Sequence, residues 1–400
     1  MSRAPLKDLV RANAWIGLQL GVVAALGLAL RLSMVHATND DAETQLGWLH
    51  FMRAHGGVEA LKFDEQGGAF SNYTPFYTYL LLIGDHLKFG ASDLVVVKWG
   101  AIAADFVCAA FVYRIVRLRY PVGDAPTIAA AVILLTPTIA INSAYWGQID
   151  MLWAAPLVAS VYYLLVGRSL AAVVAFSIGL ATKQQAEFLA PLLVVLALKR
   201  RVAWRHFLAV PAVYFILVIP ALVEGRSLWS LITIYSEQAK KFHNLTYNAP
   251  SAWSWVPTNL SVQLNRPAEI WGVSLVLLIM FVAVAVRYEP TQRLLVAMAT
   301  ISVLYVPFVL PRMHERYFFA GDVLSIVLVF FSLRLFPVAL LVQGASFFSY
   351  WPFLWRAELF SGKVLVLAEL IAIVILLAWV ALQIRRQHDA HAGTPLHQLE

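Results

Sequence analysis

The feature that most constrains this chain is a series of apolar runs, most of them nearly as long as a lipid bilayer is thick. We identify twelve, at about 12–31, 92–113, 124–141, 150–166, 169–183, 185–199, 206–223, 268–287, 291–310, 317–333, 336–352 and 363–384. A helix crosses the hydrocarbon core with about 20 apolar residues, whereas a membrane β-strand alternates over about ten. Lipid tolerates only structures that satisfy every backbone hydrogen bond internally. The runs therefore predict an all-α polytopic membrane protein with twelve transmembrane helices.

Composition agrees and excludes other classes of protein. Of the 400 residues, 60% are hydrophobic and 13% are charged, whereas soluble domains have roughly 45–50% and 25%. The single cysteine, Cys108, excludes an intramolecular disulfide and a cysteine-based metal site. The net charge of +7 does not indicate a nucleic-acid partner, because the basic residues gather at alternate ends of the apolar runs.

That charge asymmetry predicts an orientation, since Lys and Arg concentrate in cytosolic loops. The first run follows Arg3, Lys7 and Arg11 without a small-residue cleavage site, which is typical of a signal anchor. We expect both termini in the cytosol and long outer loops at about 32–91 and 224–267. We also expect one transmembrane domain over 1–384 and a cytosolic tail over 385–400, polar and disordered from 387. The composition favours a bacterial inner membrane, with the outer loops facing the periplasm or exterior.

The first outer loop is unusually rich in charge and in aromatic side chains. Asp40, Asp41 and Glu43 lie near its start, before Trp48. A weakly apolar stretch over 73–87 predicts a juxtamembrane helix at the membrane surface, with a re-entrant span as the alternative.

Five polar clusters fall on the outer side if this topology holds. They lie at 40–48, 71–77, 142–150, 183–187 and 311–317. Each also fits a structural interpretation. Trp146 is typical of the interfacial aromatic belt, Lys183 can snorkel from a helix end, and the acids at 40 and 41 can be solvated loop residues.

The last cluster is the hardest to explain as a solvated loop. Arg312, His314, Glu315 and Arg316 lie in a connection too short to lift them out of the headgroup layer. A guanidinium binds phosphate through a planar bidentate fork, and its weak hydration suits a site with little water. With Lys183 nearby, these residues predict an anion site at membrane depth.

Asp41 offers the complementary chemistry, because a carboxylate can accept the proton of a hydroxyl. An anion site and a carboxylate base on the same face indicate attack by an alcohol on a carbon whose leaving group is a lipid phosphate. We therefore expect Asp41 and Arg312 to share one cavity that opens away from the cytosol.

These residues resemble a known family. The segments 146–150, 183–185, 248–253 and 313–317, with the acidic first loop, resemble the GT-C membrane glycosyltransferases, which use polyprenyl-phosphate sugars. The most similar members are the first mannosyltransferase of GPI-anchor synthesis and bacterial relatives. The resemblance covers about 30–320, in the right order.

The resemblance implies a role for each matching residue. The catalytic base matches Asp41 best, with Asp40 as the alternative, because the acids are adjacent here instead of forming an Asp-x-Asp pattern. Adjacent side chains of an extended chain diverge, so only one acid can face the substrate. The donor phosphate would be bound by Arg312, His314, Arg316 and Lys183. The sugar or acceptor would be contacted by Tyr73, Trp146, Gln148, Asp150, His243, Asn248 and Glu315.

The implied reaction is a single inverting displacement, without a metal or other cofactor. The family favours mannose as the transferred sugar, and the acceptor would be a hydroxyl on a lipid, a glycan or a protein. Two alternatives stay open: a lipid-linked sugar flippase or transporter, and an O-antigen polymerase or ligase. The halves of the chain show no internal similarity of the kind many transporters have.

Overall fold

The computed structural model describes residues 6–64 and 70–392. Its long helices occupy the predicted apolar runs. They are α1 (Leu6–Leu32), α4 (Asp93–Arg119), α5 (Ala125–Leu135), α7 (Asp150–Leu165), α8 (Ser169–Thr182), α9 (Ala190–Leu198), α10 (Ala209–Val223), α12 (Ser261–Ala285), α13 (Gln292–Val309), α14 (Phe319–Phe331), α15 (Phe336–Ser349) and α17 (Gly362–Ala392). The expected all-α polytopic membrane fold is confirmed.

The helices differ in whether they are long enough to span a bilayer. Among the described residues, seven are long and apolar enough. α5 forms a pair, bent by 50°, with the segment made of α6 (Pro137–Ala140) and the π-helix η3 (Ile141–Trp146), and this pair is either a broken eighth span or a re-entrant loop. Four predicted runs form shorter apolar helices, at Asp150–Leu165, Ser169–Thr182, Gln184–Leu198 and Phe319–Phe331. Each of these four begins or ends beside one of the polar clusters, so the clusters lie between helix ends within the bundle.

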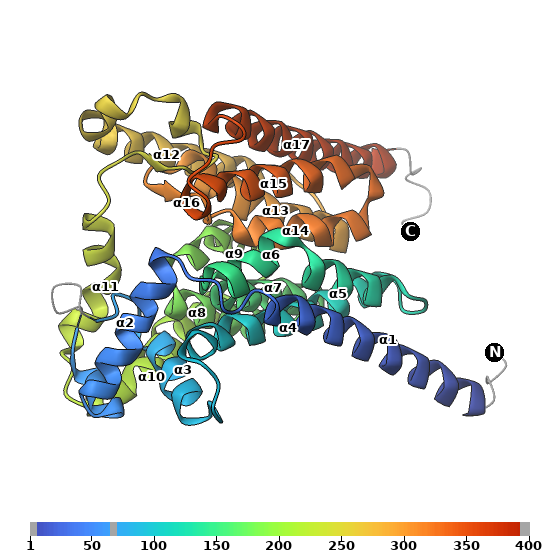
Figure 1. The fold of residues 1–400 in the computed structure, drawn as a ribbon. Coiled ribbons are helices and arrows are strands. Elements are labelled where there is room, and N and C mark those ends of the chain that lie inside the picture. The colour runs from blue at the N-terminus through green and yellow to red at the C-terminus, as the bar shows by residue number, and fades with distance from the viewer. Residues whose placement is uncertain (1–5, 65–69, 393–400) are drawn as a thin grey trace.

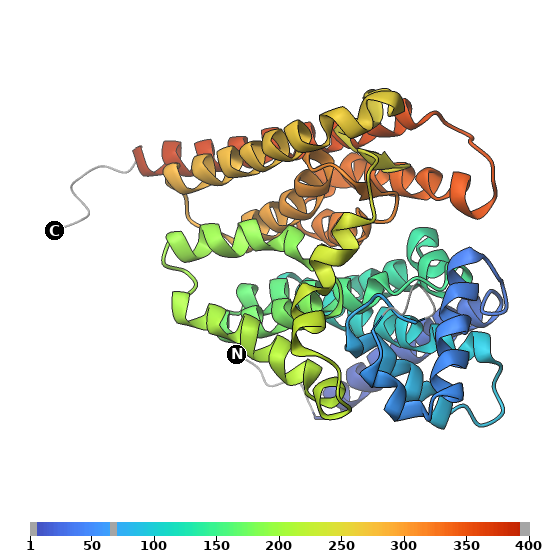
Figure 2. The ribbon, with the colours of Figure 1, turned by 90° about the vertical axis from the view of Figure 1, so that its left-hand side faces the viewer.

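The helices form two stacked groups (Figure 1). The elements from α1 to α8, with α10, make the lower group and those from α12 to α17 the upper one, as the turned view also shows (Figure 2). α9 lies between them and packs on α12 and α13. The groups meet where α14 contacts α4, α5 and α7, and where α13 contacts α7 and α9. The start of α1 and the end of α17 lie at the same end of the bundle, on the right of Figure 1. This arrangement agrees with the expectation that both termini face one side of the membrane.

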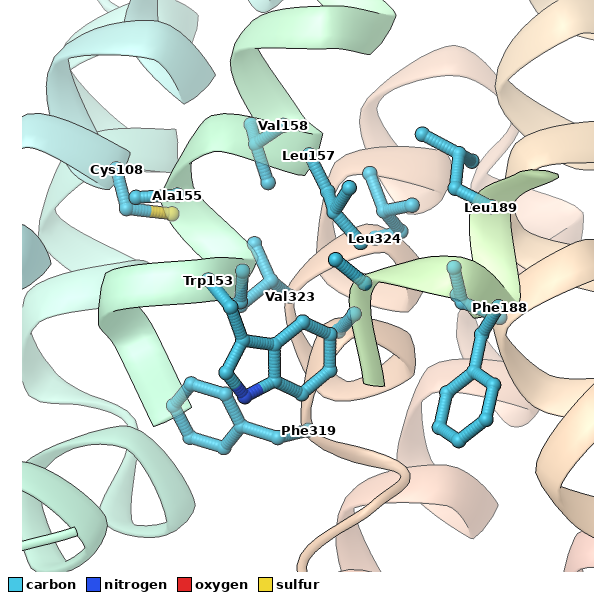
Figure 3. Packing of buried hydrophobic residues seen from close by; sticks show 14 of the residues in the cluster. Cys108, Trp153, Ala155, Leu157, Val158, Phe188, Leu189, Phe319, Val323 and Leu324 are labelled. Carbon is cyan, nitrogen blue, oxygen red and sulfur yellow. The ribbon is translucent and has the colours of Figure 1, made fainter. Parts of the chain in front are cut away.

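The core between the groups is packed with large apolar side chains. Figure 3 shows Trp153 of α7 beside Phe319 of α14, and both are fully buried. Lipid is as apolar as this core, so close packing holds membrane helices together more than the hydrophobic effect does. Gly179 of α8 illustrates such packing, since a Cβ there would lie 2.9 Å from the carbonyl oxygen of Trp153. A side chain at Gly179 would push α8 away from α7.

The first outer loop contains α2 (Asp40–Ala54), the 3-10 helix η1 (Gly57–Lys62) and α3 (Pro75–His86). The expectation of an extended acidic pair is wrong, because Asp40 and Asp41 open α2. Asn39 caps this helix by accepting hydrogen bonds from the backbone N–H groups of Asp41 and Ala42, both at 3.1 Å. Asx N-caps and first-turn acids stabilise a helix start, because they satisfy free N–H groups and complement the helix dipole.

Arg53 fastens α2 to its neighbours. Its guanidinium pairs with Asp85 of α3 and with Asp93 at the start of α4, both at 2.6 Å. The hydrogen bond from Arg53 lowers the pKa of the Asp85 carboxyl. These ion pairs fix the C-terminal end of α2 against α3 and α4. They therefore help to position the acids at the start of the same helix.

The second outer loop contains α11 (Leu228–Lys240) and joins the connection after α13 through a short parallel pair of strands. These are β1 (Thr246–Tyr247) and β2 (Met313–His314), with Tyr247 opposite His314. At the other end of the chain, α17 continues to Ala392, so the disorder predicted from 387 is wrong over 387–392. The rest of the expected tail, 393–400, lies outside the described residues.

Candidate active site

The carboxylate of Asp41 is fixed by two side chains that flank a tight turn. Its Oδ2 atom accepts hydrogen bonds from Trp146 Nε1 at 2.7 Å and from Gln148 Nε2 at 2.5 Å. Both donors flank Gly147, whose φ of +82° is readily adopted only by glycine. Both bonds end on Oδ2, and no hydrogen bond from the described residues reaches Oδ1. One carboxylate oxygen is thus fixed while the other can meet a ligand.

Lys98 stabilises the same turn through hydrogen bonds. Its buried ammonium group donates to the carbonyl oxygens of Val35, Ala37, Ala144 and Tyr145, at 2.7 to 3.0 Å. The first two carbonyls precede α2 and the last two belong to η3. Lys98 therefore fixes the segment before Asp41 against the segment that carries Trp146.

Asp150 and Lys183 form a second, buried part of the site. The Lys183 Nζ to Asp150 Oδ1 distance is 2.7 Å, and the two side chains are 5% and 0% exposed. Asp150 also accepts hydrogen bonds from Asn142 at 2.9 Å and from Trp153 at 3.0 Å. A buried charge needs such partners, because water cannot replace them. Lys183 is an ion-pair partner, which a snorkelling lysine would not be.

Arg316 lies between these two parts. Its guanidinium pairs with Glu315 at 2.6 Å and lies 5.6 Å from the ring centroid of Trp146. It interacts electrostatically with both Asp41 and Asp150. The site therefore combines two cations with three carboxylates.

Tyr73 interacts with both cations of the site, Lys183 and Arg316. The Lys183 ammonium lies 5.4 Å from its ring centroid, and its hydroxyl interacts electrostatically with Arg316. Burial raises the pKa of the Tyr73 hydroxyl, so this group stays protonated at neutral pH.

His314 lies beside the site but is not a cation. Burial, together with Arg316 and Lys183, lowers the pKa of its imidazole to about 2. The ring stacks on Tyr247, with centroids 4.6 Å apart and 7° between the planes. The expected role of His314 in binding the donor phosphate stays a prediction. The Nε2 atom of His314 is buried and has no hydrogen-bond partner among the described residues, so it can bond to a ligand.

Arg312 lies in a neighbouring cavity. It bonds to Asn265 at 2.9 Å and pairs with Glu269 at 2.7 Å. The cavity has a volume of about 370 Å³ and is lined by Gln184, Gln185, Glu187, Gln238, Phe242, Glu269, Arg312, Tyr317 and several apolar residues. Asp41 is not among its lining residues. The expectation that Asp41 and Arg312 share one cavity stays a prediction. Arg316 belongs to the ion cluster. Tyr317, the next residue in the sequence, lines the cavity.

The structure separates the two adjacent acids. Asp40 is exposed and pairs with Arg356 at 2.7 Å on the surface, whereas Asp41 is half-buried in the site. Successive residues of a helix differ by about 100° in direction, which accounts for the divergence.

His243 and Asn248 take no part in the ion cluster. Both side chains are exposed in the second outer loop. Asn248 pairs with His314 through an isolated backbone bridge, and its φ is +56°.

Sequence reasoning missed several residues that position the site. Asn39 caps α2, and its side chain donates to the carbonyl oxygen of Trp146 at 2.9 Å. Gln45 donates to the carbonyl oxygen of Gly147 at 2.7 Å. Lys98 had a readable signal, because a lysine inside an apolar run seldom lacks a function.

No group of three or more His, Cys, Asp or Glu side chains within 6–64 and 70–392 could hold a metal ion. The absence of a metal from the reaction stays a prediction.

Comparison with known proteins identifies the family. The sequence model of glycosyltransferase family 87 matches residues 70–311, which is more than half of the chain. The chain belongs to glycosyltransferase family 87. The match includes Trp146, Gln148, Asp150 and Lys183, whereas Asp41 and Arg316 lie outside it. No curated protein sequence matches the chain.

A solved structure shares the fold of this family 87 protein. ArnT from Cupriavidus metallidurans, crystallised with undecaprenyl phosphate, matches with a TM-score of 0.55 and 14% sequence identity. The match covers 92% of this chain and 77% of ArnT. The protein is therefore a multi-pass membrane glycosyltransferase of the GT-C superfamily, as the resemblance implied. The family assignment replaces the alternative of a transporter.

Proposed function

We propose that this family 87 enzyme transfers a sugar from a polyprenyl-phosphate donor to a hydroxyl group of an acceptor, with inversion at the anomeric carbon. The observation that carries the proposal is the carboxylate of Asp41, fixed through one oxygen at the edge of a buried ion cluster. The undecaprenyl phosphate bound to ArnT, which shares the fold, supports a lipid phosphate as the carrier.

Asp41 acts as the general base in this proposal. Its Oδ1 accepts the proton of the acceptor hydroxyl, whose oxygen attacks the anomeric carbon as the bond to the lipid phosphate breaks. Trp146 and Gln148 hold the carboxylate in position through Oδ2. A base held in this way loses little orientational freedom in the transition state. Asp40 is excluded from this role in the proposal, because its ion pair with Arg356 faces the surface.

The leaving phosphate carries negative charge, and three groups can stabilise it. Arg316 interacts electrostatically with Asp41. Lys183 and Arg316 both interact with Tyr73. The neutral imidazole of His314 supplies a hydrogen bond through its free Nε2. Preorganised donors of this kind are among the largest contributions to enzymatic rates. Arg312 binds the phosphate from the neighbouring cavity once Glu269, which is 44% exposed, releases it.

The transferred sugar would lie between Asp41 and the ion cluster. Glu315, Asp150 and Gln148 offer hydrogen-bond acceptors, and Gln148 Oε1 is buried without a partner among the described residues. Mannose is the preferred sugar in this proposal, on the basis of the family resemblance. A lipid, glycan or protein hydroxyl serves as the acceptor, and no metal takes part.

We place the site on the outer face of a bacterial inner membrane, towards the periplasm or exterior. The basic clusters at 114–119 and 199–205 and the ends of α1 and α17 would then face the cytosol. The outer-loop helices α2, α3 and α11 lie at the opposite end, on the left of Figure 1.

The direct test measures release of the lipid phosphate from synthetic short-chain polyprenyl-phosphate sugars. Purified protein is incubated with mannose, glucose, galactose and arabinose donors and a panel of hydroxyl acceptors. Asp41→Asn should reduce kcat at least about 100-fold, because general-base catalysis contributes that much or more. Asp40→Asn is the matched control and should stay active. An active Asp41→Asn with an inactive Asp40→Asn would show that the base is misassigned.

A further inference from the structure

A buried ion pair outside the candidate active site links three elements of the lower group. Arg31, in the last turn of α1, pairs with Asp105 of α4 through Nε and Oδ2 at 2.6 Å, and both side chains are 0% exposed. The same Oδ2 atom accepts a hydrogen bond of 2.5 Å from the hydroxyl of Ser143 in η3. The function described above uses none of these three residues.

Arg31 is an unusual residue for its place in the chain. In the proposed orientation the end of α1 lies on the outer side, where arginines are less frequent than in cytosolic loops. Most of α1 has little contact with the bundle, and Trp15, Leu18 and Val22 are each at least 50% exposed. Arg31 also donates a hydrogen bond of 2.7 Å to the carbonyl oxygen of Leu134 in α5. The arginine therefore fixes the end of α1 against both α4 and α5.

The ion pair by itself is a weak source of stability. Two charges lose their hydration when they are buried, and their attraction repays that loss only if their other hydrogen bonds are also made. Here Arg31 Nη2 and Asp105 Oδ1 are buried and have no hydrogen-bond partner among the described residues. A well-packed apolar pair is often as stable or more so. The pair is therefore better explained by what it positions.

One face of α4 holds three consecutive residues of η3. Asp105 accepts a hydrogen bond from Ser143, and Lys98 donates to the carbonyl oxygens of the next two residues. Lys98 and Asp105 are seven positions apart, which is about two helical turns, so they lie on the same face of α4. The residue that follows these three is Trp146, whose indole bonds to Asp41.

The conformation of η3 makes such external contacts important. It is a π-helix of six residues. Single π-turns of this kind are rare and are frequent at functional sites. The backbone of η3 is held by Lys98, whereas the hydrogen bond from Ser143 to Asp105 holds a side chain. The two contacts together restrain both the position and the rotation of the turn.

We propose that Arg31 and Asp105 are positioning residues that act through Ser143. They fix η3, and with it the indole of Trp146 that orients the carboxylate of Asp41. This inference rests on the proposed role of Asp41 as the base. A displacement of about 1 Å caused by a change far from the chemistry can lower a rate about 100-fold.

The first test removes the hydrogen bond and keeps the ion pair. Ser143→Ala should lower kcat about tenfold for a short-chain polyprenyl-phosphate sugar, with little change in the donor KM, because the base is misplaced and the phosphate contacts are not. Ser177→Ala is the matched control. Ser177 is a buried serine of α8 that donates to the carbonyl oxygen of Val173 at 2.7 Å. The control should keep the wild-type kcat.

A double-mutant cycle separates positioning from a general loss of structure. In the Trp146→Phe background the hydrogen bond to Asp41 is already absent, so Ser143→Ala should lower kcat further by less than about twofold. The same loss in both backgrounds would show that Ser143 does not act through Trp146 and would overturn the inference. A wild-type kcat for Ser143→Ala would overturn it as well.

A second variant tests the ion pair itself. Arg31→Met combined with Asp105→Leu leaves no unpaired charge, so the variant should unfold near the wild-type Tm. Its kcat should nevertheless fall about as far as that of Ser143→Ala. Wild-type kcat in this variant would show that the pair positions nothing, and only the present inference would fail. A wild-type enzyme that releases no lipid phosphate from any donor contradicts the proposed function instead.

Discussion

The indole nitrogen of Trp146 donates a hydrogen bond of 2.7 Å to Asp41 Oδ2, across 105 positions of sequence. The orientation of the proposed base, Asp41, therefore depends on the end of η3, which is distant in sequence. The hydrogen bond also sets one oxygen of the carboxylate apart from the other.

Replacing Trp146 with Phe should remove this hydrogen bond and keep the ring. A hydrogen bond to a charged group contributes about 1.5–3 kcal/mol, so kcat should fall about 10- to 100-fold. The ring still packs on Tyr350 and Phe353, which limits the loss of stability. Steady-state kinetics with a short-chain donor measures the effect. An unchanged kcat would show that the bond does not orient the base.

Replacing Gly147 with Ala should impair catalysis through the turn. A left-handed residue with a Cβ costs roughly 1–2 kcal/mol, and the new Cβ would lie 3.1 Å from Lys98 Cε. The turn must then shift and carry Gln148 away from Asp41. Gly90→Ala is the matched control, because its φ is +85° and nothing lies within 4 Å of the added Cβ. Both variants should lose similar stability in thermal unfolding, but only Gly147→Ala should lower kcat.

Removing the charge of Lys183 should destabilise the fold strongly. Lys183→Met leaves Asp150 buried without its cation, and breaking a buried pair costs about 3–5 kcal/mol. The double variant with Asp150→Asn should lose less than the single one, because no unpaired charge remains. Chemical denaturation in detergent measures the free energies of unfolding. Glu289→Gln, which breaks the exposed pair with Arg201, is the control and should change stability by about 1 kcal/mol or less.

His314 should make the protein less stable in acid. Its pKa is about 2 in the folded protein and 6.5 when unperturbed, so only the unfolded state binds its proton between these values. Stability is therefore fully present above pH 6.5 and falls as the pH decreases, by at most about 1.4 kcal/mol per pH unit. The melting temperature of His314→Gln should depend less on pH between 7 and 5 than that of wild type. His243→Gln, at an exposed position, should behave as wild type does.

Arg312 should affect donor binding more than the chemical step. Arg312→Ala should raise the donor KM about tenfold with a small change in kcat, because a phosphate contact made in both ground and transition states acts on binding. Glu269→Gln releases Arg312 from its ion pair and should lower KM. A fall in kcat without a change in KM for Arg312→Ala would place the phosphate elsewhere.

The sequence predicted most of the polar clusters that form the site, but not the contacts between them. Trp146, Gln148, Asp150, Lys183 and Arg316 were each singled out, and the structure brings them together around Asp41. The prediction failed where the local conformation mattered. The acidic pair at 40 and 41 was interpreted as extended, although an Asn before two acids is typical of a helix start.

The contacts made at 312–316 were also not visible in the sequence. Arg312 and Arg316 are four positions apart and were expected to bind one anion together. In the structure Arg312 contacts Asn265 and Glu269 of α12, with a φ of +66°, while Arg316 interacts electrostatically with Asp41. The burial of His314 against Tyr247, which lowers the pKa of its imidazole, was not visible in the sequence.

The sequence by itself determined the membrane class, the helical architecture and the clusters that carry the chemistry. It could do so because apolar length and polar interruption are properties of consecutive residues. Only the tertiary structure decided the pairings. Lys183 meets Asp150 across 33 positions and Trp146 meets Asp41 across 105. A buried charge must be neutralised by a partner close in space, and that proximity follows from helix packing instead of order along the chain.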